Sequence, residues 1–178
     1  MKHLIMAPVL VFLALAQQSF LNQFSIMGTA PNFVFIASFI LIFFSCLQKP
    51  GKFYHNYQGM FFTLMAGFLL DVFSPYYFGA AISALLLVFM IISVTIESLK
   101  QIQDRYLFIY FILIFIACFI FYNIVLYLFL HIADISININ QRHGVELTYN
   151  LVIASLGFFL YKILFVKNTP NRQLKLFI

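Results

Sequence analysis

Charge is scarce in this sequence. Only 8% of the 178 residues are Asp, Glu, Lys or Arg, whereas 64% are hydrophobic and the mean hydropathy is +1.03. Soluble domains carry about 25% charged residues, so this composition excludes a soluble domain of useful size. The chain has room for about six apolar spans of roughly 20 residues with short links. We therefore expect an all-α integral membrane protein, with a single polytopic membrane domain over residues 1–178.

Cysteine and tryptophan are also rare. The sequence has no tryptophan and 2 cysteines, Cys46 and Cys118, which sit inside apolar runs without paired spacing. This excludes a disulfide framework and argues against metal or redox chemistry. We expect both cysteines to be small core residues. The 25 phenylalanines are explained by AT-rich coding and predict no aromatic site.

What the sequence does contain is a series of apolar runs. They predict six membrane-spanning helices, at about 4–20, 31–47, 57–73, 78–99, 106–130 and 147–166. The segment Ala14-Leu15-Ala16 also fits a signal-peptidase site, so a cleaved signal peptide is the rival interpretation of the first span. We expect an uncleaved helix, because the charge pattern works with an N-terminus inside the cell.

The ten Lys and Arg residues are divided unevenly between the two sides of this arrangement. One side carries nine of them: Lys2, Lys49, Lys52, Lys100, Arg105, Lys162, Lys167, Arg172 and Lys175. The opposite side carries Arg142. The positive-inside rule then places both termini in the cytoplasm. Topology thus accounts for the net charge of +5, which gives no indication of nucleic-acid binding.

Asp71 is an acid within the third apolar run. A carboxylate at membrane depth costs about 2.5–3.5 kcal/mol to insert, so such residues usually face a protein interior, a cavity or a partner. Gly67, Asp71 and Ser74 lie at i, i+4 and i+7, on one face of a helix. Three roles stay open for Asp71: capping a neighbouring helix near Pro75, ordering the bundle or a partner contact, and relaying protons or ions.

The fourth span opens with small residues. Gly79 with Ser83 and Ala80 with Ala84 form small-xxx-small pairs, which let helices pack closely in a membrane. Together with the tight turn at Pro75, they predict a close hairpin of the third and fourth spans. Packing within the chain is the expected use of these residues, and an exposed dimer face is the alternative.

Polar residues also occur in and between the last two spans. Asn123, Asn150 and Ser155 are expected to form hydrogen bonds between helices. His131 with Asp134 and His143 with Glu146 have i, i+3 spacing, but we interpret them as solvated residues of an outer loop rather than metal ligands. Between them, residues 134–140 alternate strictly and predict a short strand or an extended loop that meets a partner.

Several of these residues form a pattern that resembles the rod shape-determining protein MreD family. The pattern is Pro31-Asn32-Phe33-Val34 opening an early span, then Gly67 and Asp71 four residues apart, a polar turn from Ser74, and Gly79 opening the next span. Length, span count and the position of Asp71 agree over most of the chain. The motifs themselves cover about residues 31–84, and the rest matches by hydropathy alone.

The resemblance implies a non-enzymatic scaffold subunit of the bacterial cell-elongation machinery in the inner membrane, without a cofactor. It implies an MreC-like periplasmic coiled-coil protein as partner, the peptidoglycan synthases RodA and a class B penicillin-binding protein, and MreB filaments indirectly. It assigns assembly or partner roles to Pro31, Asn32, Gly67, Asp71, Ser74 and Gly79. It also implies a fold similar to the six-helix substrate-binding subunits of energy-coupling-factor transporters.

That fold similarity gives the rival function, a vitamin-capture subunit of such a transporter. Those subunits often carry spaced alanines in their first helix, and Ala7, Ala14 and Ala16 lack that spacing. A solute binder also needs several polar groups converging on one cavity. Polar residues do gather toward the outer side, at Gln17, Gln18, Asn22, Asn32 and Asp71, so a small outer cavity stays open. The absence of a nucleophile elbow, a phosphate loop or paired acids within the spans indicates that the chain is not an enzyme.

Overall fold

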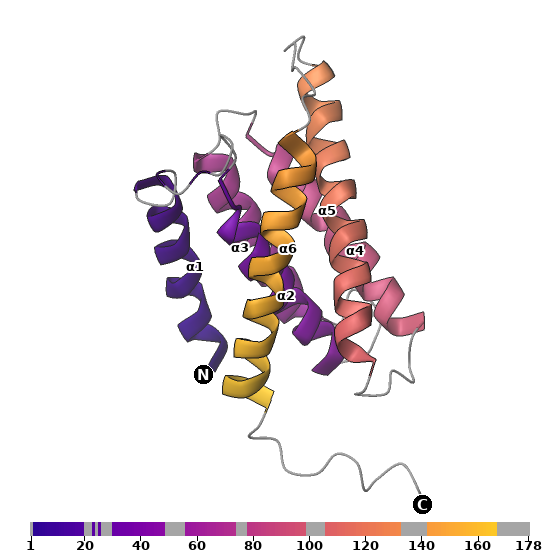
Figure 1. Cartoon of the computed structure of the whole chain (residues 1–178). Coiled ribbons are helices and arrows are strands. Elements are labelled where there is room, and N and C mark those ends of the chain that lie inside the picture. Colours follow the sequence, from indigo (N-terminus) through magenta and orange to yellow (C-terminus); the bar gives the residue numbers. More distant parts are fainter. Residues whose placement is uncertain are drawn as a thin grey trace, which may run out of the picture.

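The computed structural model describes residues 2–19, 23, 25, 30–48, 56–73, 78–98, 106–132 and 142–166. They form six α-helices: α1 (Lys2–Ser19), α2 (Phe33–Gln48), α3 (Tyr57–Phe73), α4 (Ala80–Ser98), α5 (Leu107–Ile132) and α6 (Arg142–Tyr161), which continues into a π-helical segment, η3 (Lys162–Val166) (Figure 1). The predicted all-helical class is confirmed. Three helical stretches are long and apolar enough to cross a membrane, Ala80–Ser98, Leu107–His131 and Gly144–Leu164. Three shorter apolar stretches accompany them, Ala7–Ser19, Phe33–Leu47 and Tyr57–Phe73.

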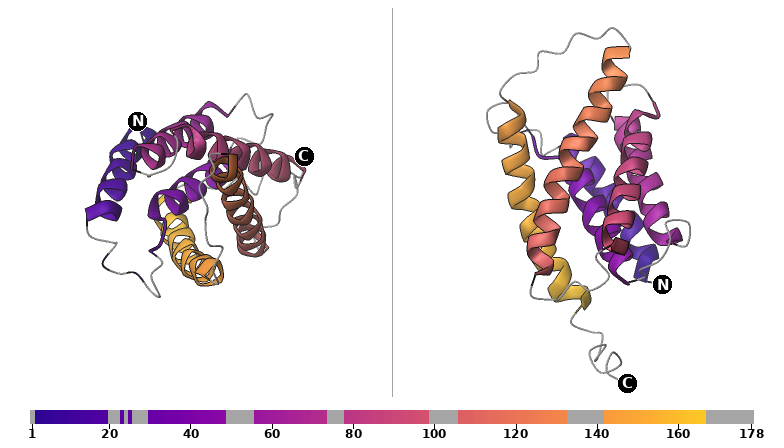
Figure 2. Two further views of the ribbon diagram at one scale, coloured as in Figure 1. Left: turned by 90° about the horizontal axis from the view of Figure 1, so that it is seen from above. Right: turned by 90° about the vertical axis from the view of Figure 1, so that its right-hand side faces the viewer.

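Helix α2 is the centre of the bundle. It packs against α1, α3, α4 and α6, and the view along the bundle shows it enclosed by its neighbours (Figure 2). Phe35, Phe39 and Phe43 on this helix have no exposed surface. A helix that is apolar all round is expected to be buried, and most residues of the 16-residue helix α2 are buried.

Two phenylalanine ladders join α2 to α5. On α2 the ladder is Phe35, Phe39 and Phe43, and on α5 it is Phe111, Phe115 and Phe119. The ring centroids of Phe39 and Phe115 lie 5.0 Å apart, and those of Phe43 and Phe111 lie 5.2 Å apart, in edge-to-face geometry. Each such pair contributes about 0.5–1.5 kcal/mol beyond burial. Phenylalanine therefore has a packing function here that its attribution to coding bias did not predict.

The six helices run up and down, so that their ends gather at two ends of the bundle (Figure 1). Helices α1, α3 and α5 end, and α2, α4 and α6 begin, at what we call the pocket end. The start of α1 and the end of η3 lie together at the opposite end (Figures 1 and 2). With 26 residues, α5 is about 39 Å long, and its last turns extend beyond the other helices at the pocket end (Figure 1).

Three predicted helix starts were placed wrongly by a few residues. Pro31 was expected inside the first turn of the second helix, but α2 begins at Phe33 because the side chain of Asn32 caps it. The fourth helix begins at Ala80 instead of residue 78, after Gly79 with its positive φ of 101°. The sixth begins at Arg142 instead of residue 147, because hydropathy could not detect its polar first turn.

Candidate functional site

Asp71 lies near the end of α3, and its carboxylate caps the start of α4. Its Oδ1 accepts a hydrogen bond from the backbone N–H of Ala81 at 2.8 Å. Its Oδ2 accepts bonds from the N–H groups of Gly79 at 2.9 Å and Ile82 at 3.2 Å. Asp71 as a whole is only 4% exposed. The first N–H groups of a helix lack partners within the helix, so Asp71 satisfies groups that would otherwise be stranded in an apolar interior.

Gly79 explains why an acid from another helix is used. The carbonyl of Gly79 accepts the bond from the N–H of Ser83 at 3.0 Å, which makes Gly79 the N-cap residue of α4. Its φ of 101° suits glycine and disfavours residues with a side chain. With no side chain at the N-cap, Asp71 supplies the oxygens, and its negative charge suits the positive end of the helix dipole. Capping of a neighbouring helix, one of the three roles left open for Asp71, is thus observed, and the same bonds order the bundle by joining α3 to α4. A partner contact and a proton or ion relay stay predictions.

Gly67 brings the backbones of α3 and α4 into contact one turn below Asp71. A Cβ atom at Gly67 would lie 2.7 Å from the Cα of Ile82, which is too close for any side chain. Ala80, Ala81 and Ala84 on the facing part of α4 are all buried. The close hairpin of these two helices is therefore confirmed, with its small residues packed inside the chain. Ser74, the third residue on this helix face, lies outside the described residues.

Asn32 organises the start of α2 in a different way. Its Oδ1 accepts the N–H of Phe35 at 3.0 Å, and its carbonyl accepts the N–H of Ile36 at 3.0 Å, so Asn32 is an ordinary N-cap. Its own N–H donates to Oδ1 of Asn150 on α6 at 2.9 Å. Pro31, immediately before it, is buried. Asn32 and Asn150 therefore join α6 to the start of α2, and we call this contact region the α2 corner.

The end of α1 completes the same corner. Oε1 of Gln17 accepts the N–H of Val34 at 3.2 Å, and Nε2 of Gln18 donates to the carbonyl of Phe73 at 3.0 Å. Side-chain amides of α1 thus bind the start of α2 and the end of α3. The Nδ2 of Asn150, fully buried, has no hydrogen-bond partner among the described residues.

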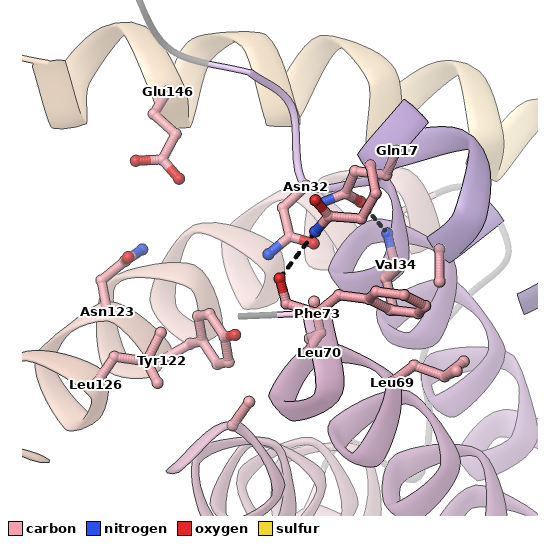
Figure 3. Close-up of a pocket in the computed structure, with 13 residues that line it drawn as sticks. Gln17, Asn32, Val34, Leu69, Leu70, Phe73, Tyr122, Asn123, Leu126 and Glu146 are labelled. Atoms are coloured by element: carbon pink, nitrogen blue, oxygen red, sulfur yellow. Dashed lines mark hydrogen bonds between the residues drawn. The ribbon is translucent and has the colours of Figure 1, made fainter. Parts of the chain in front are cut away.

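A pocket of about 300 Å³ lies beside this corner, at the pocket end. Figure 3 shows Gln17 and Asn32 on one side of it, and Asn123 of α5 and Glu146 of α6 on another. Apolar side chains complete the lining, among them Leu69, Leu70, Phe73 and Leu126. Gln17, Gln18 and Asn32 were predicted on this side of the membrane. Asn123 and Glu146 were not predicted as members of one cavity, since their positions became clear only when α5 and α6 were placed.

A second polar group at the opposite end had no signal in the sequence. Asn56 caps α3, because its Oδ1 accepts the N–H of Gly59 at 3.1 Å. The same oxygen accepts the hydroxyl of Ser45 at 2.8 Å, and Nδ2 donates to Sγ of Cys46 at 3.2 Å. Ser93 of α4 lies 3.5 Å from that sulfur. All are buried, so this group joins the end of α2 to α3 and α4.

The remaining polar predictions were partly wrong. Asn150 does form a hydrogen bond to another part of the bundle, at Asn32. Nδ2 of Asn123 donates to the carbonyl of Phe119, and the hydroxyl of Ser155 donates to the carbonyl of Leu151. Both of these bonds lie within one helix. His131, His143 and Glu146 lie on α5 and α6 instead of in a loop, while residues 134–140 lie outside the described residues. Within the described ranges, no three His, Cys, Asp or Glu side chains gather as metal ligands would. The two cysteines are free and buried, as expected for core residues.

What the site can do follows from these contacts. Gly67, Asp71, Gly79 and Asn32 fix the mutual positions of helix ends, and their polar atoms face backbone groups of the chain itself. The pocket beside them is lined by amide and carboxylate side chains together with apolar ones. No protein-family model, no curated protein and no solved structure matches the chain.

Proposed function

We propose that this protein is a non-enzymatic scaffold subunit of the bacterial cell-elongation machinery, which directs peptidoglycan synthesis in rod-shaped cells. The proposal rests on the pattern resembling the MreD family and on how its residues are used. The observation that supports it most directly is that the carboxylate of Asp71 accepts hydrogen bonds from three backbone N–H groups at the start of α4. An acid bound in this way fixes the position of α3 relative to the start of α4, and a fixed arrangement of helices suits a scaffold role.

The proposed setting is the inner membrane, with six spans and both termini in the cytoplasm. In this arrangement α1, α2 and α3, of 18, 16 and 17 residues, are about 24–27 Å long. They are shorter than the roughly 30 Å hydrocarbon core, but local thinning of the bilayer and burial of α2 by its neighbours accommodate them. The nine-to-one charge division supports this orientation.

Cysteine labelling tests the orientation. Cysteines replacing Lys49 and Lys175 should resist an impermeant thiol reagent added outside the cell, while a cysteine replacing Asn138 should react. Cys46 and Cys118 are buried and give a low background. Labelling at residue 49 from outside would overturn the orientation.

The proposed partners are an MreC-like periplasmic protein with one anchor helix, the synthases RodA and a class B penicillin-binding protein, and MreB filaments indirectly. The exposed apolar faces of α5 and α6, such as Leu113, Ile120 and Leu156, offer sites for an anchor helix within the bilayer. The protruding end of α5 offers a contact above it. The chain should therefore co-purify with the MreC-like protein in mild detergent.

Depletion in the native host is the direct test of the function. Rod-shaped cells should become spherical as the protein disappears, and the wild-type gene should restore rods. Unchanged cell shape together with loss of vitamin uptake would instead favour the second candidate, a capture subunit of an energy-coupling-factor type transporter with a similar fold. The observation that favours this candidate is the pocket of about 300 Å³ with its polar lining.

A further inference from the structure

The helices on the outside of the bundle differ in apolar length. In α1 the apolar run covers residues 4–16 and ends before Gln17, so it is about 20 Å long. The neighbouring α3 has 17 residues and is about 26 Å long. The apolar stretch of α5, Leu107–His131, has 25 residues and is about 38 Å long. Against a hydrocarbon core of roughly 30 Å, α1 is too short by about 10 Å, whereas α5 is long enough.

The short helix and the long helix face the surroundings on different sides of the bundle. Helix α1 packs against α2 and α3, whereas α5 packs against α4 and α6, and α2 lies between them (Figure 2). Each presents a stripe of exposed apolar side chains, which are Val9, Phe12 and Leu15 on α1 and Ile109, Leu113, Ile120, Ile124 and Leu128 on α5. From Ile109 to Leu128 the stripe on α5 is about 29 Å long, nearly the thickness of the whole core.

Helix α1 cannot correct this difference by moving along its axis. Its last turn is fixed, because Oε1 of Gln17 accepts the N–H of Val34 at the start of α2. Next to it, Nε2 of Gln18 donates to the carbonyl of Phe73 at the end of α3. Tilting would only shorten the distance that α1 spans. When a helix is too short for the core, the bilayer thins around it.

The polar groups of the pocket give an independent measure of the same difference. Asn123 of α5 lines the pocket together with Gln17 and Asn32. Beyond Asn123, α5 continues to the exposed Leu128, about 8 Å further along the helix. A flat bilayer surface at the level of Leu128 would therefore cover the pocket and the exposed Gln18 with hydrocarbon, which is costly for polar groups. A surface that is about 8 Å lower on this side leaves them in the headgroup layer.

We propose that this protein thins the bilayer on one side, beside α1 and α3, and leaves the full thickness beside α5. The dip lies in the leaflet at the pocket end, because α5 extends beyond the other helices there (Figure 1). The outer surface of α1 and α3 is thus a binding surface for phospholipids with short acyl chains. The polar pocket lies at the bottom of the dip, level with headgroups and water. This thinning requires the six-span membrane setting proposed above but none of the scaffold partners.

Two tryptophan reporters test the difference between the two sides. The sequence has no tryptophan, so Phe12→Trp on α1 and Ile120→Trp on α5 each give one signal from an exposed position. The purified full chain is placed in vesicles of brominated dioleoylphosphatidylcholine, which quenches tryptophan, mixed with a lipid of shorter or longer chains. Beside Phe12→Trp, dimyristoleoylphosphatidylcholine should displace the quencher roughly 3- to 10-fold better than dierucoylphosphatidylcholine, as expected for a mismatch of several Å. Beside Ile120→Trp, the longer lipid should bind at least as well as the shorter one.

The same chain-length preference at both reporters would overturn the proposal. A folded Phe12→Trp that brominated lipid does not quench would also overturn it, since a protein surface such as a second copy of the chain would then cover α1. If Phe12→Trp does not fold, Val9→Trp reports from the same exposed stripe. Quenching of both reporters with equal preference would leave the membrane setting and the scaffold proposal standing, because cysteine labelling and depletion test those separately.

A matched pair of serines locates the dip at the end of α1. Ser19 and Ser98 are both exposed at the last residue of a helix, and each hydroxyl donates to the carbonyl four residues earlier. In the Phe12→Trp background, Ser19→Leu extends the apolar stripe of α1 by one turn and should reduce the preference for the short lipid about twofold. Ser98→Leu, at the opposite end of the bundle on α4, should leave that preference unchanged. An equal change in both variants, or no change in Ser19→Leu, would contradict a dip beside α1.

Discussion

Helices α2 and α4 both begin at the pocket end, but their first turns take their acceptors from different places. Helix α2 is capped by Asn32, the residue directly before it, whose Oδ1 binds the N–H of Phe35, and Gln17 of α1 adds one bond to the N–H of Val34. Helix α4 begins after a glycine, and its cap comes from Asp71, eight residues before Gly79 and on another helix. A local cap stabilises one helix, whereas a cap from a neighbouring helix also fixes the position of that neighbour. Asp71 therefore couples the end of α3 to the start of α4.

Removing the remote cap should have the largest effect. Asp71→Leu leaves three N–H groups without an acceptor in a buried site, at about 1–3 kcal/mol for each stranded group. Asp71→Asn keeps one oxygen acceptor and should be milder. The unfolding temperature in mild detergent and the recovery of folded protein measure both effects.

The same pair of variants separates structure from chemistry. If the role of Asp71 is structural, Asp71→Asn should retain partial function and Asp71→Leu should lose it with the fold. Equal and complete loss of function in two folded, partner-bound variants would point to proton transfer by the carboxyl group.

Closing the gap between α3 and α4 is expected to have the next largest effect. In Gly67→Ala the new Cβ would meet the backbone of Ile82 at 2.7 Å, so the helices must separate and Asp71 loses its alignment. We expect a loss of about 1–3 kcal/mol, as for overpacked cores. Gly144→Ala is the matched control, because nothing lies within 4 Å of its Cβ position, and it should be neutral or slightly stabilising. Equal stability of the two variants would show that the close approach is unimportant.

The local caps should matter less. Asn32→Ala removes the acceptor for Phe35 and should cost about 1 kcal/mol, while Asn32→Asp should retain most of the stability. Asn56→Ala should cost more than Asn32→Ala, since Asn56 also accepts from Ser45 and donates to Cys46. Thermal unfolding of the variants side by side checks the order. A local cap that costs as much as Asp71→Leu would remove the contrast between the two kinds of cap.

The sequence predicted the features that depend on long runs or near neighbours. Apolar length located all six helices, and small residues around Gly67 and Gly79 predicted the close hairpin. The start of α6 was missed because residues 142–146 are too polar for a hydropathy window, although a helix end outside the apolar layer can be polar. The capping role of Asp71 also needed the structure, since the three N–H groups belong to another helix.

The contacts that remained hidden join residues far apart in the chain. Asn56 and Ser93 reach Cys46 from two different helices, and nothing in their spacing reveals it. Asn123 and Ser155 were predicted to form hydrogen bonds with neighbouring helices, but each bonds to the backbone carbonyl four residues earlier in its own helix. Such bonds satisfy a polar side chain within its own helix, so a polar residue in an apolar run does not by itself predict a contact between helices.

The smallest expected effect tests whether the cap of α3 is purely local. Sγ of Cys46 accepts a hydrogen bond from Nδ2 of Asn56, so Cys46→Ala should weaken this cap. Cys118→Ala is the control, because it removes a fully buried thiol in the apolar core on α5. Each substitution should lower the free energy of unfolding by about 1 kcal/mol or slightly more. Because sulfur is a weak acceptor, the two costs should differ by a few tenths of a kcal/mol. In a double-mutant cycle, Cys46→Ala combined with Asn56→Ala should be less destabilising than the sum of the two, because they share a contact. The pair Cys118→Ala and Asn56→Ala should be additive. Additivity in both pairs would show that the thiol of Cys46 contributes nothing to the cap of α3, and α2 would then support Asn56 only through the hydroxyl of Ser45.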